Sequence, residues 1–107
     1  MIETKSAAVR DPENCRSMIE VRAGVDDVDR ALIGLLERRF AYMDAAARIK
    51  PDREHVRDEA RKAQVIANAR RHAQAAGIPA EAIVEIWDRL VEASIAYELE
   101  SFDRLRR

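Results

Sequence analysis

The sequence predicts an all-α protein with three helices, in the order long, medium, long. Its 107 residues include only 3 Gly, 3 Pro and 5% aromatic residues, which leaves little material for the turns and strands of a sheet. Apolar residues recur instead at steps of three and four along two long stretches, 18–49 and 83–105, and this is the period of an amphipathic helix. A chain of this length forms one domain at most.

The first predicted helix is about 33 residues long. Ser17 and Glu20 have the spacing of a capping box, which places its start at residue 17 or 18. Pro51 ends it, because the residue before a proline is pushed out of the α region. Residues 1–13 show no apolar period, so we expect a disordered or loosely ordered segment there and a helical domain over 14–107.

Two further helices are predicted after a short loop at Pro51. The second is expected over 54–76, and its apolar side consists mostly of alanine. Gly77 suits a left-handed stop at its end. The third helix begins near Pro79, a residue favoured in a first helical turn, and runs to about residue 104.

The length of the first helix predicts a homodimer. About 33 residues extend about 50 Å, whereas a compact domain of about 100 residues has a radius of gyration near 13 Å. The chain is therefore too small to cover the apolar side of this helix by itself. We expect the remaining surface to pair with a second copy, which gives an intertwined dimer.

Polar residues interrupt both long apolar stripes. Arg39 occupies a position of the first stripe where a leucine would fit, and Ser94 and Glu98 occupy two positions of the last. Burying an unpartnered guanidinium costs several kcal/mol. The polar positions therefore face each other or share a polar ligand, and this predicts a small polar pocket inside a helical bundle.

The spacing of three cations suggests how such a pocket is assembled. Arg39 and Lys50 are about 20° apart around a helix axis and about 16 Å apart along it, so both side chains reach one small ligand. Arg22 is about 25 Å from Arg39 and turned by about 100°, so it would join them only from a partner subunit. The alternatives are a solvated Arg22 and a Lys50 that stabilises the helix C-terminus. Asp58 and Arg61, three residues apart, can pair on one helix face.

Composition excludes several functional classes. A formal net charge of −1 gives no general attraction to nucleic acid or to an anionic membrane. Cys15 is the single cysteine, so an intrachain disulfide is impossible. We find no stretch with the apolar length of a membrane span or a secretory signal, and we expect a cytoplasmic protein. No zinc, phosphate-loop, dinucleotide or catalytic-triad motif is present, so we expect neither a metal nor a cofactor.

Seven of these positions, in register over three helices, resemble one family. They are Arg22, Arg39 and Lys50, then Asp58 and Arg61 in the segment Val56-Arg57-Asp58-x-x-Arg61, and Ser94 and Glu98, with Gly77 between the last two helices. In this arrangement the chain resembles the all-helical class of chorismate mutases over roughly residues 12–102. The resemblance implies an intertwined three-helix dimer with two equivalent sites.

The resemblance also implies a role for each position. The residue matching Arg22 reaches in from the other subunit, and those matching Arg39 and Lys50 bind the substrate carboxylates and ether oxygen. Asp58 and Ser94 match groups near the substrate hydroxyl and a carboxylate, and Arg61 matches a carboxylate-binding arginine. Lys50, Glu98 and Arg39 are the implied catalytic residues.

Other features resemble a branch of that family, the isochorismate-pyruvate lyases of salicylate synthesis. They are the segments Asp11–Cys15 and Arg38–Lys50. Two positions depart from the usual mutase pattern. Glu98 stands where the family usually has Gln, and Lys62 stands where a Glu often follows the residue matching Arg61, which affects recognition of the substrate hydroxyl.

The implied activity is the rearrangement of chorismate to prephenate, a unimolecular reaction for which a protein supplies a compact substrate conformer and charge complementarity. Glu98 helps only when it carries a proton; burial favours that form and nearby cations oppose it. One alternative is an isochorismate-pyruvate lyase, which forms salicylate and pyruvate. Another is a non-catalytic dimerisation module in which the charges on the apolar stripes form interhelical salt bridges.

Overall fold

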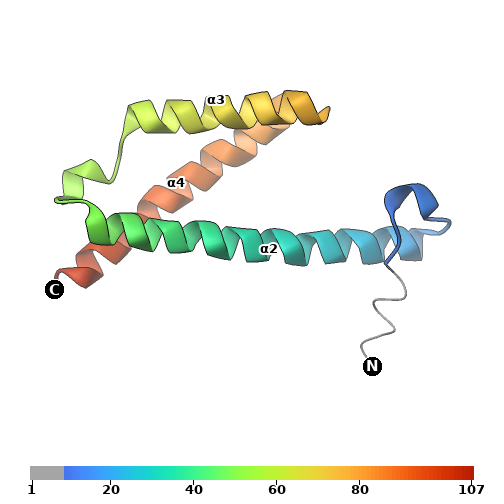
Figure 1. The fold of residues 1–107 in the computed structure, drawn as a ribbon, viewed down its shortest axis with the longest axis horizontal. Helices are drawn as coiled ribbons and strands as arrows, with labels where there is room; N and C mark the ends of the chain where they lie inside the picture. The colour runs from blue at the N-terminus through green and yellow to red at the C-terminus, as the bar shows by residue number, and fades with distance from the viewer. Residues whose placement is uncertain (1–8) are drawn as a thin grey trace. The chain divides into compact units, whose positions relative to one another are not determined.

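The computed structural model describes residues 9–107. Over these residues it contains no strand (Figure 1). It has three α-helices, α2 (Met18–Ile49), α3 (Glu59–Ala76) and α4 (Ala80–Leu105), and two short 3₁₀ helices, η1 (Pro12–Asn14) and η2 (Arg53–His55). The α-helices are 32, 18 and 26 residues long. The predicted all-α class and the order long, medium, long are confirmed.

The chain divides into two compact units, Met1–Arg39 and Phe40–Arg107, and α2 contributes residues to both. The first unit, as far as it is described, contains η1 and residues 18–39 of α2. The Ser17 hydroxyl accepts the Glu20 backbone N–H at 3.3 Å, and the Glu20 carboxylate accepts the Arg16 backbone N–H at 2.7 Å. The first contact is the Ser17 half of the predicted capping box, whereas the second reaches the residue before the N-cap. The helix begins at Met18, as the sequence predicts.

The segment before α2 was expected to be loosely ordered over 1–13. Residues 1–8 lie outside the described residues, and η1 falls within the remainder. An ion pair of 2.9 Å joins Arg10 to Glu20, and the Arg10 carbonyl oxygen would lie 3.9 Å from a Cβ placed on Gly24. The chain around η1 therefore lies close to α2 within this unit.

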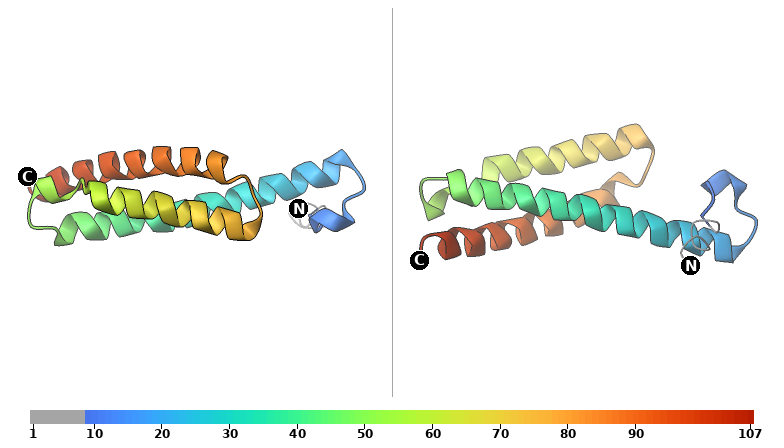
Figure 2. Two further views of the ribbon diagram at one scale, coloured as in Figure 1. Left: turned by 90° about the horizontal axis from the view of Figure 1, so that it is seen from above. Right: turned by 60° about the horizontal axis from the view of Figure 1, so that its bottom comes forward.

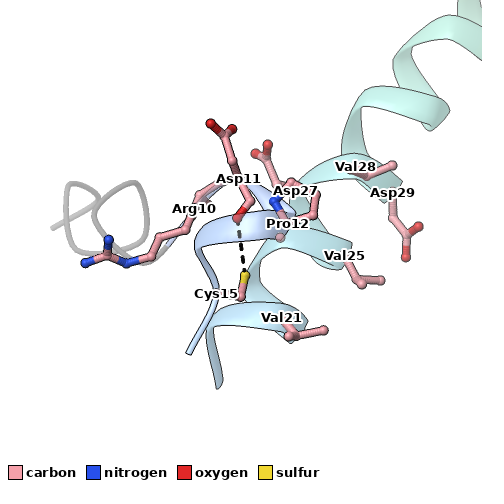
Figure 3. Close-up of a pocket in the computed structure, with 11 residues that line it drawn as sticks. Arg10, Asp11, Pro12, Cys15, Val21, Val25, Asp27, Val28 and Asp29 are labelled. Atoms are coloured by element: carbon pink, nitrogen blue, oxygen red, sulfur yellow. Dashed lines mark hydrogen bonds between the residues drawn. The ribbon is translucent and has the colours of Figure 1, made fainter. Parts of the chain in front are cut away.

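A cavity of about 440 Å³ lies between η1 and α2 in the first unit (Figure 3). Its lining residues are Val9, Arg10, Asp11, Pro12, Cys15, Val21, Gly24, Val25, Asp27, Val28 and Asp29, and none of these is a predicted site residue. Valine side chains supply much of the lining.

The predicted start of the second helix is wrong by five residues. The sequence pattern indicated residue 54, whereas α3 begins at Glu59 after η2 and an extended residue, Asp58, with φ −133° and ψ 101°. The Asp58 carboxylate accepts the Arg61 backbone N–H at 3.0 Å. Asp58 thus satisfies one of the unpaired donors of the first turn, and an N-cap of this kind sets a helix boundary.

Helices α3 and α4 form an antiparallel hairpin within the second unit (Figures 1 and 2). Gly77 joins them in the left-handed conformation, with φ 73°, and the Ile78 N–H donates to the Ala73 carbonyl at 3.1 Å. Ala69 and Ala73 are buried on α3, and Val91 is buried on α4. Small side chains of this kind let the two helices pack closely.

The core of the second unit lies beside the end of α2. It contains Ala47 of α2, Val56 of the following segment and Phe102 of α4, with Ile95 and Leu99 packed against them. Lys50 follows Ala47 by one turn, and Glu98 lies among the α4 members of this core. The fold therefore brings these two charged residues to one apolar neighbourhood.

Candidate active site

Lys50 and Glu98 form a charged pair inside the second unit. Lys50 Nζ lies 2.8 Å from Glu98 Oε2 and also donates to the Val56 carbonyl oxygen at 3.3 Å. Glu98 is 4% exposed, and Lys50 is half-buried. Glu98 Oε2 is buried, and the Lys50 ammonium is the cation that the structure places against it. A buried carboxylate is costly unless a partner compensates its charge, so the two residues act as one unit.

Ser94 lies one helical turn before Glu98 on the same side of α4. It is 4% exposed, and its hydroxyl donates to the Leu90 carbonyl oxygen at 2.7 Å. The stripe of buried polar residues continues to Ser101, which is fully buried. The sequence predicts Ser94 and Glu98 as polar members of this stripe, and the structure adds Ser101, one turn after Glu98.

Asp58 and Arg61 lie at the start of α3, and both are exposed. Their expected side-chain pair is not what the structure describes. The Asp58 carboxylate accepts the backbone N–H of Arg61, whereas the Arg61 guanidinium donates to Gln64 Oε1. The spacing of three residues is therefore that of a helix cap, because a carboxylate at the N-cap reaches the N–H groups of the first turn.

Arg22 and Arg39 belong to the first compact unit, whereas Lys50, Glu98 and the remaining predicted residues belong to the second. Arg22 is exposed on α2, and Arg39 is half-buried on the same helix. The structure thus joins Lys50 to Glu98 and places Ser94 one turn away. The roles of Arg22 and Arg39 stay predictions.

A second polar group absent from the predictions links α2 to α4 near this pair. Asp44 accepts hydrogen bonds from the Tyr97 hydroxyl and from the Ser101 hydroxyl, each at 2.9 Å. The hydrogen bond to the Asp44 carboxylate raises the pKa of Tyr97, because the charged acceptor favours the protonated phenol. Phe40 packs edge-on against the Tyr97 ring, with 5.0 Å between centroids. These contacts join α2 to α4 at Tyr97 and Ser101, on either side of Glu98 in the sequence.

Lys62, one of the two departures from the mutase pattern, is bound to carboxylates of α4. Its Nζ lies 2.6 Å from Glu92 and 3.1 Å from Asp88, and Arg57 Nη2 lies 2.6 Å from Glu92. The hydrogen bond from Arg57, followed by that from Lys62, lowers the pKa of Glu92 from its ordinary 4.5 to about 2. The Lys62 ammonium is therefore held against α4.

The lowered pKa of Glu92 predicts a specific acid sensitivity. A carboxyl with a depressed pKa in the folded state stabilises the fold fully above its unfolded pKa of 4.5, and this contribution is lost as pH falls toward about 2. We expect the stability difference between the natural protein and Glu92→Gln to stay constant at neutral pH and to shrink through this window. Urea unfolding at a series of pH values measures it. If the natural protein and Glu92→Gln were equally stable at neutral pH, the stabilising role of the Glu92 carboxylate would be contradicted. As a control, replacing both Arg57 and Lys62 with Met should abolish the pH-dependent difference in stability.

Within residues 9–107, no group of three or more His, Cys, Asp or Glu side chains is arranged to hold a metal ion. None of the helices described there has the length and apolar character of a membrane span.

Fold and site together define an all-α protein that holds an ionisable pair between the end of one helix and the middle of another. The family described as chorismate mutase type II matches residues 21–99, and the chain belongs to this family. The match includes all seven predicted site residues. An isochorismate pyruvate lyase from Pseudomonas aeruginosa is 24% identical over 98 residues, which cover 92% of this chain and 97% of that protein. The protein is therefore an enzyme of this family, as the resemblance predicted.

Proposed function

We propose that the protein is a homodimeric chorismate mutase that converts chorismate to prephenate. The observation that carries the proposal is the half-buried Lys50 ammonium, 2.8 Å from the buried carboxylate of Glu98. A cation enclosed in this way is suited to stabilise negative charge that develops on an uncharged atom. The match of Asp58, Arg61 and Ser94 to the mutase pattern favours chorismate as the substrate.

In the proposed reaction one C–O bond breaks and one C–C bond forms within a single molecule, with no nucleophile. Lys50 faces the ether oxygen, on which negative charge develops as the C–O bond breaks. Arg22, Arg39 and Arg61 hold the two carboxylates and select the compact conformer, which supplies much of the rate enhancement of such a reaction. Ser94 and Asp58 orient the substrate ring through its hydroxyl and a carboxylate.

The second candidate is an isochorismate-pyruvate lyase. The similarity to the Pseudomonas aeruginosa lyase over 92% of this chain favours it, together with the segments Asp11–Cys15 and Arg38–Lys50. The same cations would bind isochorismate, whose two carboxylates offer the same charge. Elimination of pyruvate also develops charge on the ether oxygen, so Lys50 keeps its role.

Incubation of the purified protein with chorismate and with isochorismate, separately, tests the proposal. We expect saturable formation of prephenate from chorismate. Salicylate and pyruvate from isochorismate, without prephenate from chorismate, would establish the lyase instead. If neither substrate is consumed and no chorismate analogue binds, both enzymatic proposals are wrong.

The apolar surface of α2 supports the dimer. Seven residues of its predicted apolar stripe are between 38% and 64% exposed: Met18, Val21, Val25, Val28, Leu32, Leu35 and Tyr42. At about 25 cal/mol per Å² of apolar area, burying such a stripe is strongly favourable. The occupant we propose is the same stripe of a second copy, which would bring Arg22 to the partner's site.

The carboxylate of Glu98 predicts an effect of its neutral counterpart. In the free protein this carboxylate pairs with Lys50, so it offsets the charge that the ether oxygen needs. Glu98→Gln removes the negative charge and supplies an amide N–H that can donate a hydrogen bond. We therefore expect the kcat/KM of Glu98→Gln at neutral pH to equal or exceed that of the natural protein, as steady-state kinetics with chorismate would measure. An inactive Glu98→Gln protein would rule out this role.

A further inference from the structure

Arg106 connects the end of α4 to the end of α2. Its Nη1 donates to the Ala47 carbonyl oxygen and its Nη2 to the Lys50 carbonyl oxygen, each at 3.0 Å. The guanidinium also lies 3.6 Å from the centroid of the Phe102 ring. The C-terminal ends of α2 and α4 lie next to each other (Figures 1 and 2).

The end of α2 needs such a contact. The last carbonyl groups of a helix have no partner within the helix, and here the residue after Lys50 is Pro51, which has no N–H to offer. A glycine cap is also absent from this position of the sequence. The two parallel donors of one arginine satisfy two of these carbonyls at once, and the positive charge is favourable at a helix C-terminus.

We propose that Arg106 is a positioning residue for Lys50, an inference that rests on the proposed function. Lys50 lies just beyond the last residue of α2, where helices fray. Its backbone direction is fixed by its own N–H, which donates to Ala46 at 2.9 Å, and by the Arg106 bond to its carbonyl. From that fixed point the side chain reaches Glu98 Oε2 and the Val56 carbonyl. Arg106 reaches Lys50 through the backbone, so it acts without contact with the substrate.

Kinetics of Arg106→Ala test the proposal. A misplaced Lys50 weakens stabilisation of the transition state more than binding of the substrate, so we expect kcat to fall about tenfold and KM to change less than about twofold. Arg106→Lys supplies one ammonium group in place of the two parallel donors of the guanidinium. Its kcat should therefore lie between those of the natural protein and Arg106→Ala. Arg107→Ala is the matched control, because it removes the same charge from the neighbouring exposed residue.

A double-mutant cycle separates positioning from general support of the fold. If Arg106 acts through Lys50, Arg106→Ala should change kcat by less than about twofold in the Lys50→Ala background. A further loss of about tenfold in that background would overturn the proposal, and so would an unchanged kcat in Arg106→Ala alone.

Hydrogen exchange gives a readout that does not depend on activity. The Lys50 amide should exchange about tenfold faster in Arg106→Ala and at an unchanged rate in Arg107→Ala, because the last turn of α2 frays. If the natural protein consumes neither substrate, the proposed function fails, and the exchange rate alone decides whether Arg106 holds Lys50. An unchanged rate in Arg106→Ala would then overturn the positioning role.

Discussion

Lys50→Ala should lower kcat by about 10² to 10³, the usual cost of removing one preorganised donor from a developing negative charge. KM should change less, because the carboxylate-binding arginines are untouched. The variant should also be less stable by about 3 kcal/mol, since Glu98, at 4% exposure, loses the cation that faces it. Steady-state kinetics and urea unfolding of the same preparation measure the two effects.

A double substitution separates the two losses. Lys50→Ala combined with Glu98→Gln leaves no unpaired buried charge, so we expect stability to recover while activity stays low. Arg53→Ala is the matched control, because it removes a cation from the adjacent η2 turn that is paired with Asp103 at 2.9 Å. Full activity in Lys50→Ala would show that the lysine belongs to the fold and not to the chemistry.

The parts of the fold that the sequence predicts well have a local chemical cause. The capping pair at Ser17 and Glu20, the proline at 51 and the left-handed Gly77 each fix a helix end without reference to the rest of the chain. The start of α3 was mispredicted although its cap is also local. An aspartate can occupy an exposed position within a helix or cap the helix start, and the residue type alone does not distinguish these two roles. The extended backbone of Asp58 identifies it as the N-cap.

The candidate site likewise contains residues that local sequence predicts and contacts that depend on how the helices pack. Ser94 and Glu98 stand out because polar residues on an apolar helical stripe are detectable by spacing alone. The partner of Glu98 is not detectable in this way, since the 2.8 Å contact with Lys50 depends on how α2 and α4 pack. Arg106 carried no signal at all. In sequence, an arginine near the end of a helix is indistinguishable from a solvated cation. Only the structure shows that the Arg106 guanidinium donates to the carbonyl oxygens of Ala47 and Lys50.

Arg22→Ala should lower kcat/KM by about 10², because truncating one partner of an enclosed charge pair costs several kcal/mol. The variant also tests the proposed dimer. When Arg22 serves the partner's site, a mixed dimer of Arg22→Ala and Lys50→Ala chains has one site that lacks both residues and one that is intact. Equal amounts refolded together should therefore regain about a quarter of the natural activity.

A second mixture, in which mixed dimers have no intact site, serves as the control. Natural chains refolded with the double variant Arg22→Ala/Lys50→Ala form mixed dimers without an intact site when Arg22 acts across the interface, so about a quarter of the activity should remain. If Arg22 acts within its own chain, this mixture retains about half, and the first mixture recovers none. Size-exclusion chromatography of the same samples must show dimers, because a protein that is active as a monomer would exclude any role for Arg22 of a partner.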